Sequence, residues 1–275
     1  MTVLCHTTAG YLDLSWLDLA LGAALVLLLG LGSLRLRLGI GRALATGALR
    51  TTVQLLLMGL VLKALFGTTH PAWVAGLALV MLAVAGREVR ARQKRPFAGA
   101  AGFGLGTGAM FLSSFTVTVL ALTLMIGPEP WHAPRYAIPL LGMLLGNTMN
   151  GVGLGLDRLT QGAWQQRREI EGRLLMGETW RAAIHDLRQE AIRNGMIPVL
   201  NALAAAGIVA LPGMMTGQIL AGADPVGAVK YQILIMFLIA TGTGFGTVGA
   251  VLLGSRRLFD ERQRLRLDRL SPPRD

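Results

Sequence analysis

Seven long apolar stretches follow one another along this chain, and they constrain its fold more than any other feature. Each is close to the roughly 20 residues that an α-helix needs to cross about 30 Å of hydrocarbon. Their approximate bounds are Leu14–Leu34, Leu49–Phe66, Pro71–Gly86, Phe97–Ile126, Arg135–Leu156, Met196–Gly222 and Ala228–Gly254. The pattern predicts an all-α fold: a polytopic membrane helix bundle of about seven transmembrane helices that forms a single domain over residues 1–275.

The composition excludes most soluble proteins. Hydrophobic residues make up 53% of the chain and charged residues only 15%, whereas soluble domains carry roughly 25% charged residues. A net charge of +11 would suggest nucleic acid in a soluble protein. Here the charges lie between apolar stretches, so they indicate a membrane protein, and we expect no nucleic acid partner. The single cysteine, Cys5, excludes a disulfide framework.

The basic residues predict the orientation in the membrane. Of the 26 lysines and arginines, 23 fall on one side of the predicted spans, in the loops around Arg35–Arg50 and Arg87–Arg95, the 157–195 loop and the basic C-terminal tail 255–275. Loops rich in Lys and Arg remain in the cytoplasm. The N-terminus is therefore expected outside and the C-terminus inside, which agrees with seven spans.

The 157–195 loop is the one sizeable segment outside the predicted spans. We expect a helix over Trp164–Met176, a break at Gly177, and a second helix over Trp180–Arg193 with Thr179 as its N-cap. Trp180, Ile184, Leu187 and Ala191 recur at helical spacing and form one apolar stripe on the second helix. Such a stripe either lies on the bilayer or its own bundle, which the periodicity favours, or docks a second protein.

Glu171 and Gly177 have the spacing of a known docking motif. A glutamate followed six positions later by a glycine resembles the EAA loop of ATP-binding-cassette permeases, which contacts the ATPase subunit. Glycine permits the sharp turn between helices. Gly172 and Arg173 replace the two alanines of that motif.

Polar or helix-breaking residues also fall within predicted spans. Asn147 and Asn150 need hydrogen-bond partners in hydrocarbon, so they either bond to other helices or line a pathway. Pro212 and Gly213 interrupt the sixth stretch, as a packing kink or as the broken helix of a transport site. Met214 and Met215 follow, and their thioethers are either flexible core fillers, the more common role, or soft metal ligands.

The chain has no sequence motif for catalysis of its own. It lacks the G-x-x-x-x-G-K-[ST] phosphate loop, H-E-x-x-H and G-x-S-x-G. We therefore expect a protein that is not an enzyme, with no catalytic residues and no cofactor in this chain. The sequence leaves any metal ligands unknown.

Several segments together resemble one family. They are Arg50–Gly59, Pro139–Gly153, Glu171–Gly177 and, most specifically, Leu211–Pro225 with Ala228–Ile233. With these segments the chain resembles the FetB/YbbM-type permeases (UPF0014), described as membrane subunits of iron-export ABC transporters. The likeness extends from about Arg35 to Leu258.

The resemblance implies a homodimeric permease in the bacterial plasma (inner) membrane, working with a cytoplasmic ABC ATPase that binds ATP and Mg and exporting metal ions such as iron. Coupling to the ATPase would involve Glu171, Gly177, Glu178, Trp180 and Ile184. The translocation pathway would involve Asn147, Asn150, Pro212, Gly213, Met214 and Met215. The basic tail, with Leu258, Leu265 and Leu270, is expected to lie on anionic lipids. The alternatives are a membrane scaffold or sensor that recruits a cytoplasmic partner, a gated channel, or an ABC permease for another substrate or for import.

Overall fold

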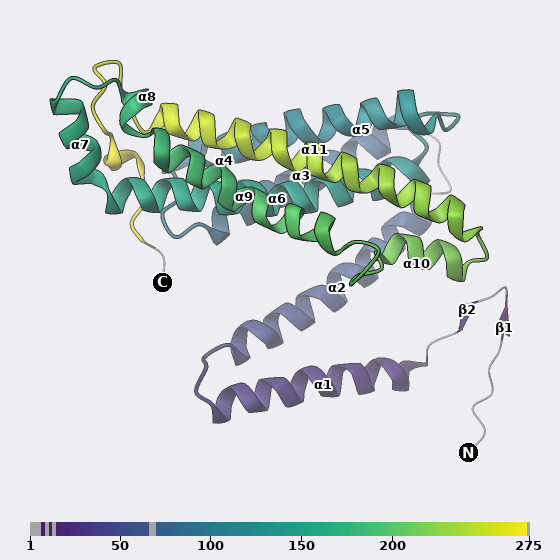
Figure 1. The fold of residues 1–275 in the computed structure, drawn as a ribbon. Helices are drawn as coiled ribbons and strands as arrows, with labels where there is room; N and C mark the ends of the chain where they lie inside the picture. The colour runs from purple at the N-terminus through teal and green to yellow at the C-terminus, as the bar shows by residue number, and fades with distance from the viewer. Residues whose placement is uncertain (1–6, 9–10, 13–14, 66–69, 274–275) are drawn as a thin grey trace. The chain divides into compact units, whose positions relative to one another are not determined.

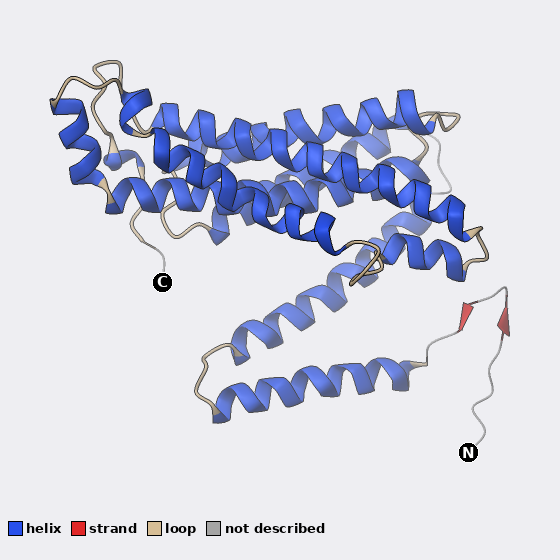
Figure 2. Ribbon diagram, in the orientation of Figure 1, coloured by secondary structure: helices blue, strands red, loops and turns tan. Residues whose placement is uncertain are grey.

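The computed structural model describes residues 7–8, 11–12, 15–65 and 70–273, and its described part is almost entirely helical (Figures 1 and 2). The helices are α1 Trp16–Arg35, α2 Gly41–Leu65, α3 Pro71–Arg92, α4 Gly99–Met110, α5 Thr116–Leu120, α6 Pro134–Gln165, α7 Arg167–Leu175, α8 Trp180–Ala183, α9 His185–Ala205, α10 Gly213–Leu220 and α11 Pro225–Arg257. Two π-helical turns, η1 Phe111–Phe115 and η2 Ala121–Ile126, continue α4 and α5, and the short 3-10 helix η3 covers Leu267–Arg269. The predicted all-α bundle is confirmed.

Among the residues that the structure describes, six helical segments are long and apolar enough to cross a membrane. They are Trp16–Arg35, Gly41–Leu65, Pro71–Arg92, Gly99–Ile126, Pro134–Gln165 and Pro225–Arg257. The remaining predicted stretch, Met196–Gly222, is divided between the end of α9 and the short α10. Gly207 has a positive φ of 84° just after α9 ends, so the break begins there and not at Pro212. Pro212 directly precedes α10, where a proline removes no helical hydrogen bond.

The chain forms two compact units, and each is described by itself. The first contains residues 1–69 and 216–228, with α1, α2 and two short antiparallel strands, β1 Thr7–Thr8 and β2 Tyr11–Leu12. Ser15 and Asp18 form a capping box at the start of α1, because each side chain bonds to the backbone N–H of the other residue. Cys5 lies outside the described residues.

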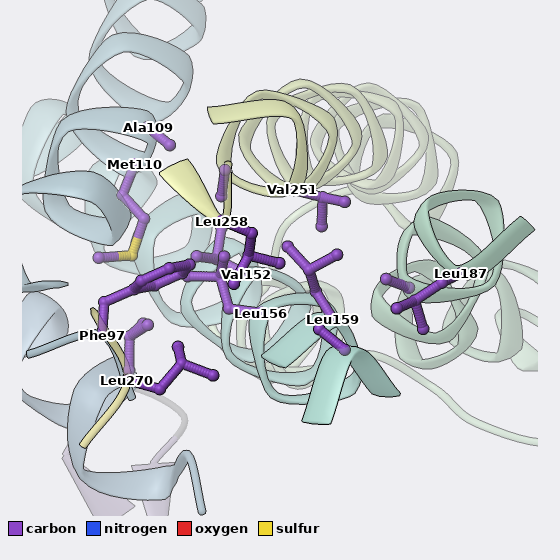
Figure 3. Packing of buried hydrophobic residues seen from close by; sticks show 14 of the residues in the cluster. Phe97, Ala109, Met110, Val152, Leu156, Leu159, Leu187, Val251, Leu258 and Leu270 are labelled. Carbon is purple, nitrogen blue, oxygen red and sulfur yellow. The ribbon is translucent and has the colours of Figure 1, made fainter. Parts of the chain in front are cut away.

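The second unit contains residues 70–215 and 229–275. Its core joins side chains from α3, α4, α6, α9 and α11, and Figure 3 shows Val152, Leu156 and Leu159 of α6 among Leu187 of α9 and Val251 of α11. Leu258 and Leu270 of the C-terminal tail belong to the same cluster, beside Phe97. The tail is therefore part of the folded bundle.

α9 packs very closely on α6. Gly151 and Gly155 of α6 face Gly195 and Ala191 of α9. A Cβ added at Gly195 would lie 2.5 Å from the carbonyl oxygen of Gly151 and 2.5 Å from Cγ2 of Thr247 on α11. Three helices thus meet at Gly195. The first residues of α9 belong to the 157–195 loop, so this helix connects the loop directly to the contact.

Candidate coupling site and translocation pathway

The turn after α7 is the most exposed apolar feature at the tip of the 157–195 loop. Gly177 has a φ of 91° and donates its N–H to Leu174 O at 3.0 Å, and the Glu178 N–H bonds to Arg173 O at 3.1 Å. These two bonds are those of a Schellman motif, which explains why a glycine stands here. The turn leaves Leu175 89% and Met176 77% exposed.

Leu175 and Met176 are adjacent, and apolar surface that is rimmed by polar residues suits a binding surface. Glu171 and Glu178, predicted for coupling, are also exposed beside this turn. The position of Gly177 in a sharp turn agrees with the prediction from its spacing. Leu175 and Met176 were not among the predicted site residues, because neither helical periodicity nor the EAA-like spacing distinguishes them from core residues.

The other two predicted coupling residues face inward. Ile184 is 0% exposed and Trp180 is half-buried against the core. The predicted stripe, which also contains Leu187 and Ala191, is buried in the bundle. The stripe therefore packs on its own bundle, as the periodicity favours, and a role of Ile184 in coupling stays a prediction.

The C-terminal tail holds the start of α8. Thr179 occupies the N-cap position as predicted, but its side chain makes no capping hydrogen bond. Instead, the Trp180 N–H donates to Oε1 of Gln263 at 2.9 Å. The Trp180 ring also packs on Phe259, with the ring centroids 5.5 Å apart. In Figure 1, the tail lies beside α7 and α8 at one end of the second unit.

Backbone pairing fixes the tail to the loop before α4. The Ala98 N–H donates to Arg269 O and the Ser271 N–H donates to Pro96 O, both at 2.8 Å. Phe97 and Leu270 form the bridge between these two bonds and are both buried. Leu258 and Leu270 thus face the protein core and Leu265 packs against it, so the expectation that these leucines lie on lipid is wrong.

Ion pairs order the tail further. Asp260 accepts hydrogen bonds from the backbone of Arg262 and Arg264, and its pKa is lowered chiefly by the bond from the Arg264 backbone. Two parallel bonds from the Arg266 guanidinium lower the pKa of Asp268 to about 2. Both carboxylates are therefore charged at neutral pH.

The predicted pathway residues belong to two segments, with the two asparagines on α6 and the other four residues at or just before the start of α10. Asn147 donates to Met143 O in its own helix, and Asn150 accepts a hydrogen bond from Arg92 of α3 at 2.8 Å. Bonding to other helices, one of the two alternatives, therefore holds for Asn150. Gly213 begins α10, Met214 is half-buried, and Met215 is buried.

Buried hydroxyls form a polar seam that the sequence did not reveal. Ser114 Oγ donates to Thr148 Oγ1 at 3.2 Å, and both side chains are fully buried. Thr243 and Thr247 of α11 are buried nearby, and their hydroxyl oxygens have no hydrogen-bond partner among the described residues. By contrast, Thr118 and Thr160 bond to carbonyls of their own helices. The signal available in the sequence was the alternation of Gly and Thr over residues 241–247.

The seam also coincides with a helix irregularity. Ser113 and Ser114 lie in the π-helical turn η1, and π-helical turns are rare and often mark functional sites.

Over residues 7–8, 11–12, 15–65 and 70–273, no group of three or more His, Cys, Asp or Glu side chains could hold a metal ion.

Comparison with known proteins identifies the family. The profile of the uncharacterised protein family UPF0014 matches residues 16–259. The UPF0014 membrane protein slr1647 of Synechocystis is 38% identical over 92% of this chain and 95% of its own. The chain belongs to UPF0014.

Two other bacterial relatives align over nearly their whole lengths. The membrane protein YjkA of Bacillus subtilis is 34% identical over 92% of this chain and 99% of its own. The probable iron export permease protein FetB of Escherichia coli is 31% identical over 90% of this chain and 93% of its own. No solved structure matches the chain. With the six apolar helices, these relatives confirm a multi-pass protein of the bacterial inner membrane.

The UPF0014 profile ends at residue 259, so the part of the tail that caps α8 lies beyond the matched region. The resemblance could therefore give no information about Gln263. Its contact with Trp180 joins residues 83 positions apart, and no local pattern predicts such a contact.

Phe259→Ala should loosen the start of α8. Phe259 is buried against Trp180, and removing a buried Phe side chain costs about 3–5 kcal/mol of unfolding free energy. Hydrogen exchange of the amides of residues 180–184 should become faster. Phe237→Ala is the matched control, since Phe237 is 62% exposed in α11. Equal exchange of these amides in both variants would show that the tail does not hold α8.

Proposed function

We propose that this chain is the membrane permease subunit of an ATP-binding-cassette transporter that exports metal ions, iron in particular, from the cytoplasm. The observation that carries the proposal is the alignment with the probable iron export permease of Escherichia coli over nearly the whole of both chains. ATP hydrolysis would belong to a separate subunit that binds ATP and Mg, because this chain has no phosphate-loop motif. We propose no enzymatic activity and no cofactor for this chain itself.

The geometry of the α7–α8 turn supports a docking role. Leu175 and Met176 present apolar surface at the tip of the loop, flanked by the exposed carboxylates of Glu171 and Glu178. Interfaces have apolar centres and polar rims, as this tip does. We propose that the cytoplasmic ATPase binds here, with Leu175 and Met176 at the centre of the contact.

The connection from the turn into the membrane supports the coupling. α8 and α9 follow the turn directly, and α9 contacts α6 and α11 at Gly195. Movement of the turn would therefore shift the point where these helices meet, close to the buried hydroxyls of Thr243 and Thr247. We propose that this seam, rather than Asn150, lines the pathway, because Asn150 is bonded to Arg92.

The proposed assembly follows from the resemblance. Two copies of this chain would form a homodimer with two ATPase subunits. The basic tail would face the anionic lipids of the inner membrane, and the assembly would have no nucleic acid partner.

Inside-out vesicles that contain both subunits test the transport proposal. The ATPase should copurify with this chain in equal copies, and ATP should drive iron into the vesicles, which corresponds to export from the cell. The control is the same complex with the phosphate-loop lysine of the ATPase changed to alanine, which should accumulate no iron. Iron entry at an equal rate without ATP would instead identify a channel, and an absence of any copurified ATPase would favour a scaffold.

A further inference from the structure

A basic cavity lies where α4 begins and α11 ends. Its volume is about 950 Å³. One wall is apolar and consists of residues of the two membrane helices, Ala101, Gly104 and Leu105 of α4 and Leu253 of α11. The other wall carries five arginines of α11 and the C-terminal tail: Arg256, Arg257, Arg262, Arg264 and Arg269.

The charge on the basic wall is only partly neutralised. Asp260 also lines the cavity, but it pairs with Arg264 at 2.7 Å and with Arg266 at 3.8 Å. Glu261 contributes one more carboxylate. Arg256 and Arg262 form no ion pair with a described carboxylate, and Nε of Arg257 is buried without a hydrogen-bond partner among the described residues. The cavity therefore offers guanidinium groups to an anion.

An apolar groove continues from the same place along the membrane helices. Its volume is about 760 Å³, and it lies between the α4–η2 segment and α11. Its lining includes Gly108, Leu112 and Val117 on one side and Phe245 and Leu253 on the other. Leu253 lines both the groove and the basic cavity, so the two hollows adjoin.

We propose that this pair of hollows is a binding site for one anionic phospholipid. The phosphate-bearing headgroup occupies the arginine cavity and an acyl chain occupies the adjoining groove. Basic pockets at the cytoplasmic ends of membrane helices bind anionic headgroups, and guanidinium groups suit phosphate oxygens. A soluble phosphate would explain the arginines but not the adjoining groove. The inference does not depend on the proposed transport function.

The lipid also gives the tail its place at the membrane. The leucines of the tail face the protein core, so its arginines would reach the membrane through this headgroup and not through apolar insertion. Because the same tail caps α8 through Gln263, a bound lipid would stabilise the capped arrangement.

Native mass spectrometry of the full-length chain tests the site. The binding of phosphatidylglycerol is compared with that of phosphatidylcholine, which has no net charge. Glycerol phosphate is the soluble anion in the same comparison. Arg256→Gln with Arg262→Gln should weaken phosphatidylglycerol binding about thirtyfold, since each arginine near an anionic lipid contributes roughly fivefold. Arg168→Gln with Arg193→Gln removes the same charge from exposed sites outside the cavity and should change the affinity less than twofold.

A second variant leaves the charge unchanged. Gly108→Trp should fill the groove, because a Cβ at Gly108 meets no atom within 4 Å. It should weaken phosphatidylglycerol binding about tenfold, whereas Gly76→Trp, at an equally open position on α3, should not.

Three results would overturn the proposal. Equal losses in the two arginine pairs would mean a general effect of charge. Binding of glycerol phosphate as tight as that of the lipid would identify a soluble anion as the ligand. Unchanged lipid binding by Gly108→Trp, together with loss of a dimer in the same spectra, would assign the groove to a second copy of the chain.

Discussion

Gly195→Ala should destabilise the second unit by about 3 kcal/mol, since forcing an extra carbon into a closely packed site costs roughly 1–3 kcal/mol and sometimes more. The added Cβ would lie 2.5 Å from the carbonyl oxygen of Gly151, and a backbone atom inside a helix cannot move aside as the end of a flexible side chain can. It would also lie 2.5 Å from Cγ2 of Thr247, which is fully buried. Relief therefore requires α9 to move away from both α6 and α11.

The free energy of unfolding in detergent, or the midpoint of thermal unfolding, measures this effect. Gly153→Ala is the matched control, because it lies on α6 two residues from Gly151 and a Cβ there meets no atom within 4 Å. That variant should be neutral or gain up to about 1 kcal/mol from the higher helix propensity of alanine. Equal stability of the Gly195 and Gly153 variants would mean that α9 does not approach α6 as described.

The membrane fold was predictable because hydrocarbon imposes one requirement on every span. Long apolar runs must be helical in a bilayer, so six of the seven stretches appear as single helices. The ends were less predictable, since helices continue into water when no residue stops them. α2 begins at Gly41, eight residues before the predicted Leu49, because Arg42 is as compatible with a helix as the apolar residues that follow it.

The division of the Met196–Gly222 stretch shows a different limit. Pro212 is a strong helix breaker, so the sequence predicts the interruption of the stretch at Pro212. In the structure the helix ends earlier, before Gly207, and Pro212 lies between helices. Glycine alone is a weaker signal, because many glycines in this chain stand within helices. Ile208 and Val209, 90% and 84% exposed after the break, look like span residues in the sequence.

In the candidate site, the local turn could be predicted from the sequence, whereas the contact with the C-terminal tail could not. A positive φ at Gly177 follows from glycine chemistry and could be expected locally. The cap of α8 by Gln263 depends on the return of a tail 83 residues away, and an exposed glutamine carries no signal for such a contact. The stripe that contains Ile184 has two possible partners, a second protein or its own bundle, and periodicity cannot distinguish them.

Gly177→Pro should abolish coupled transport while the membrane bundle stays folded. Proline fixes φ near −65°, whereas Gly177 has a φ of 91°, and proline lacks the N–H that bonds to Leu174 O. The Schellman turn cannot form, so Leu175 and Met176 lose their fixed position at the tip of the loop. With the purified ATPase, the variant should hydrolyse ATP while moving less than about a tenth of the wild-type iron, since a lost docking contact of about 1.4 kcal/mol already costs tenfold.

Two further variants distinguish the effect of the turn's backbone shape from the effect of the glycine residue itself. Gly177→Asn keeps the N–H and tolerates a left-handed backbone, so it should retain most of the transport. Gly172→Ala changes another glycine of the same segment at an ordinary helical position, and it should stabilise α7 slightly without affecting transport. If the proline variant transports normally with the ATPase still bound, the α7–α8 turn has no part in coupling, and the force of the ATPase must enter through another surface. If instead the asparagine variant fails as completely as the proline variant, the glycine is required for close approach of the partner and not for the shape of the turn.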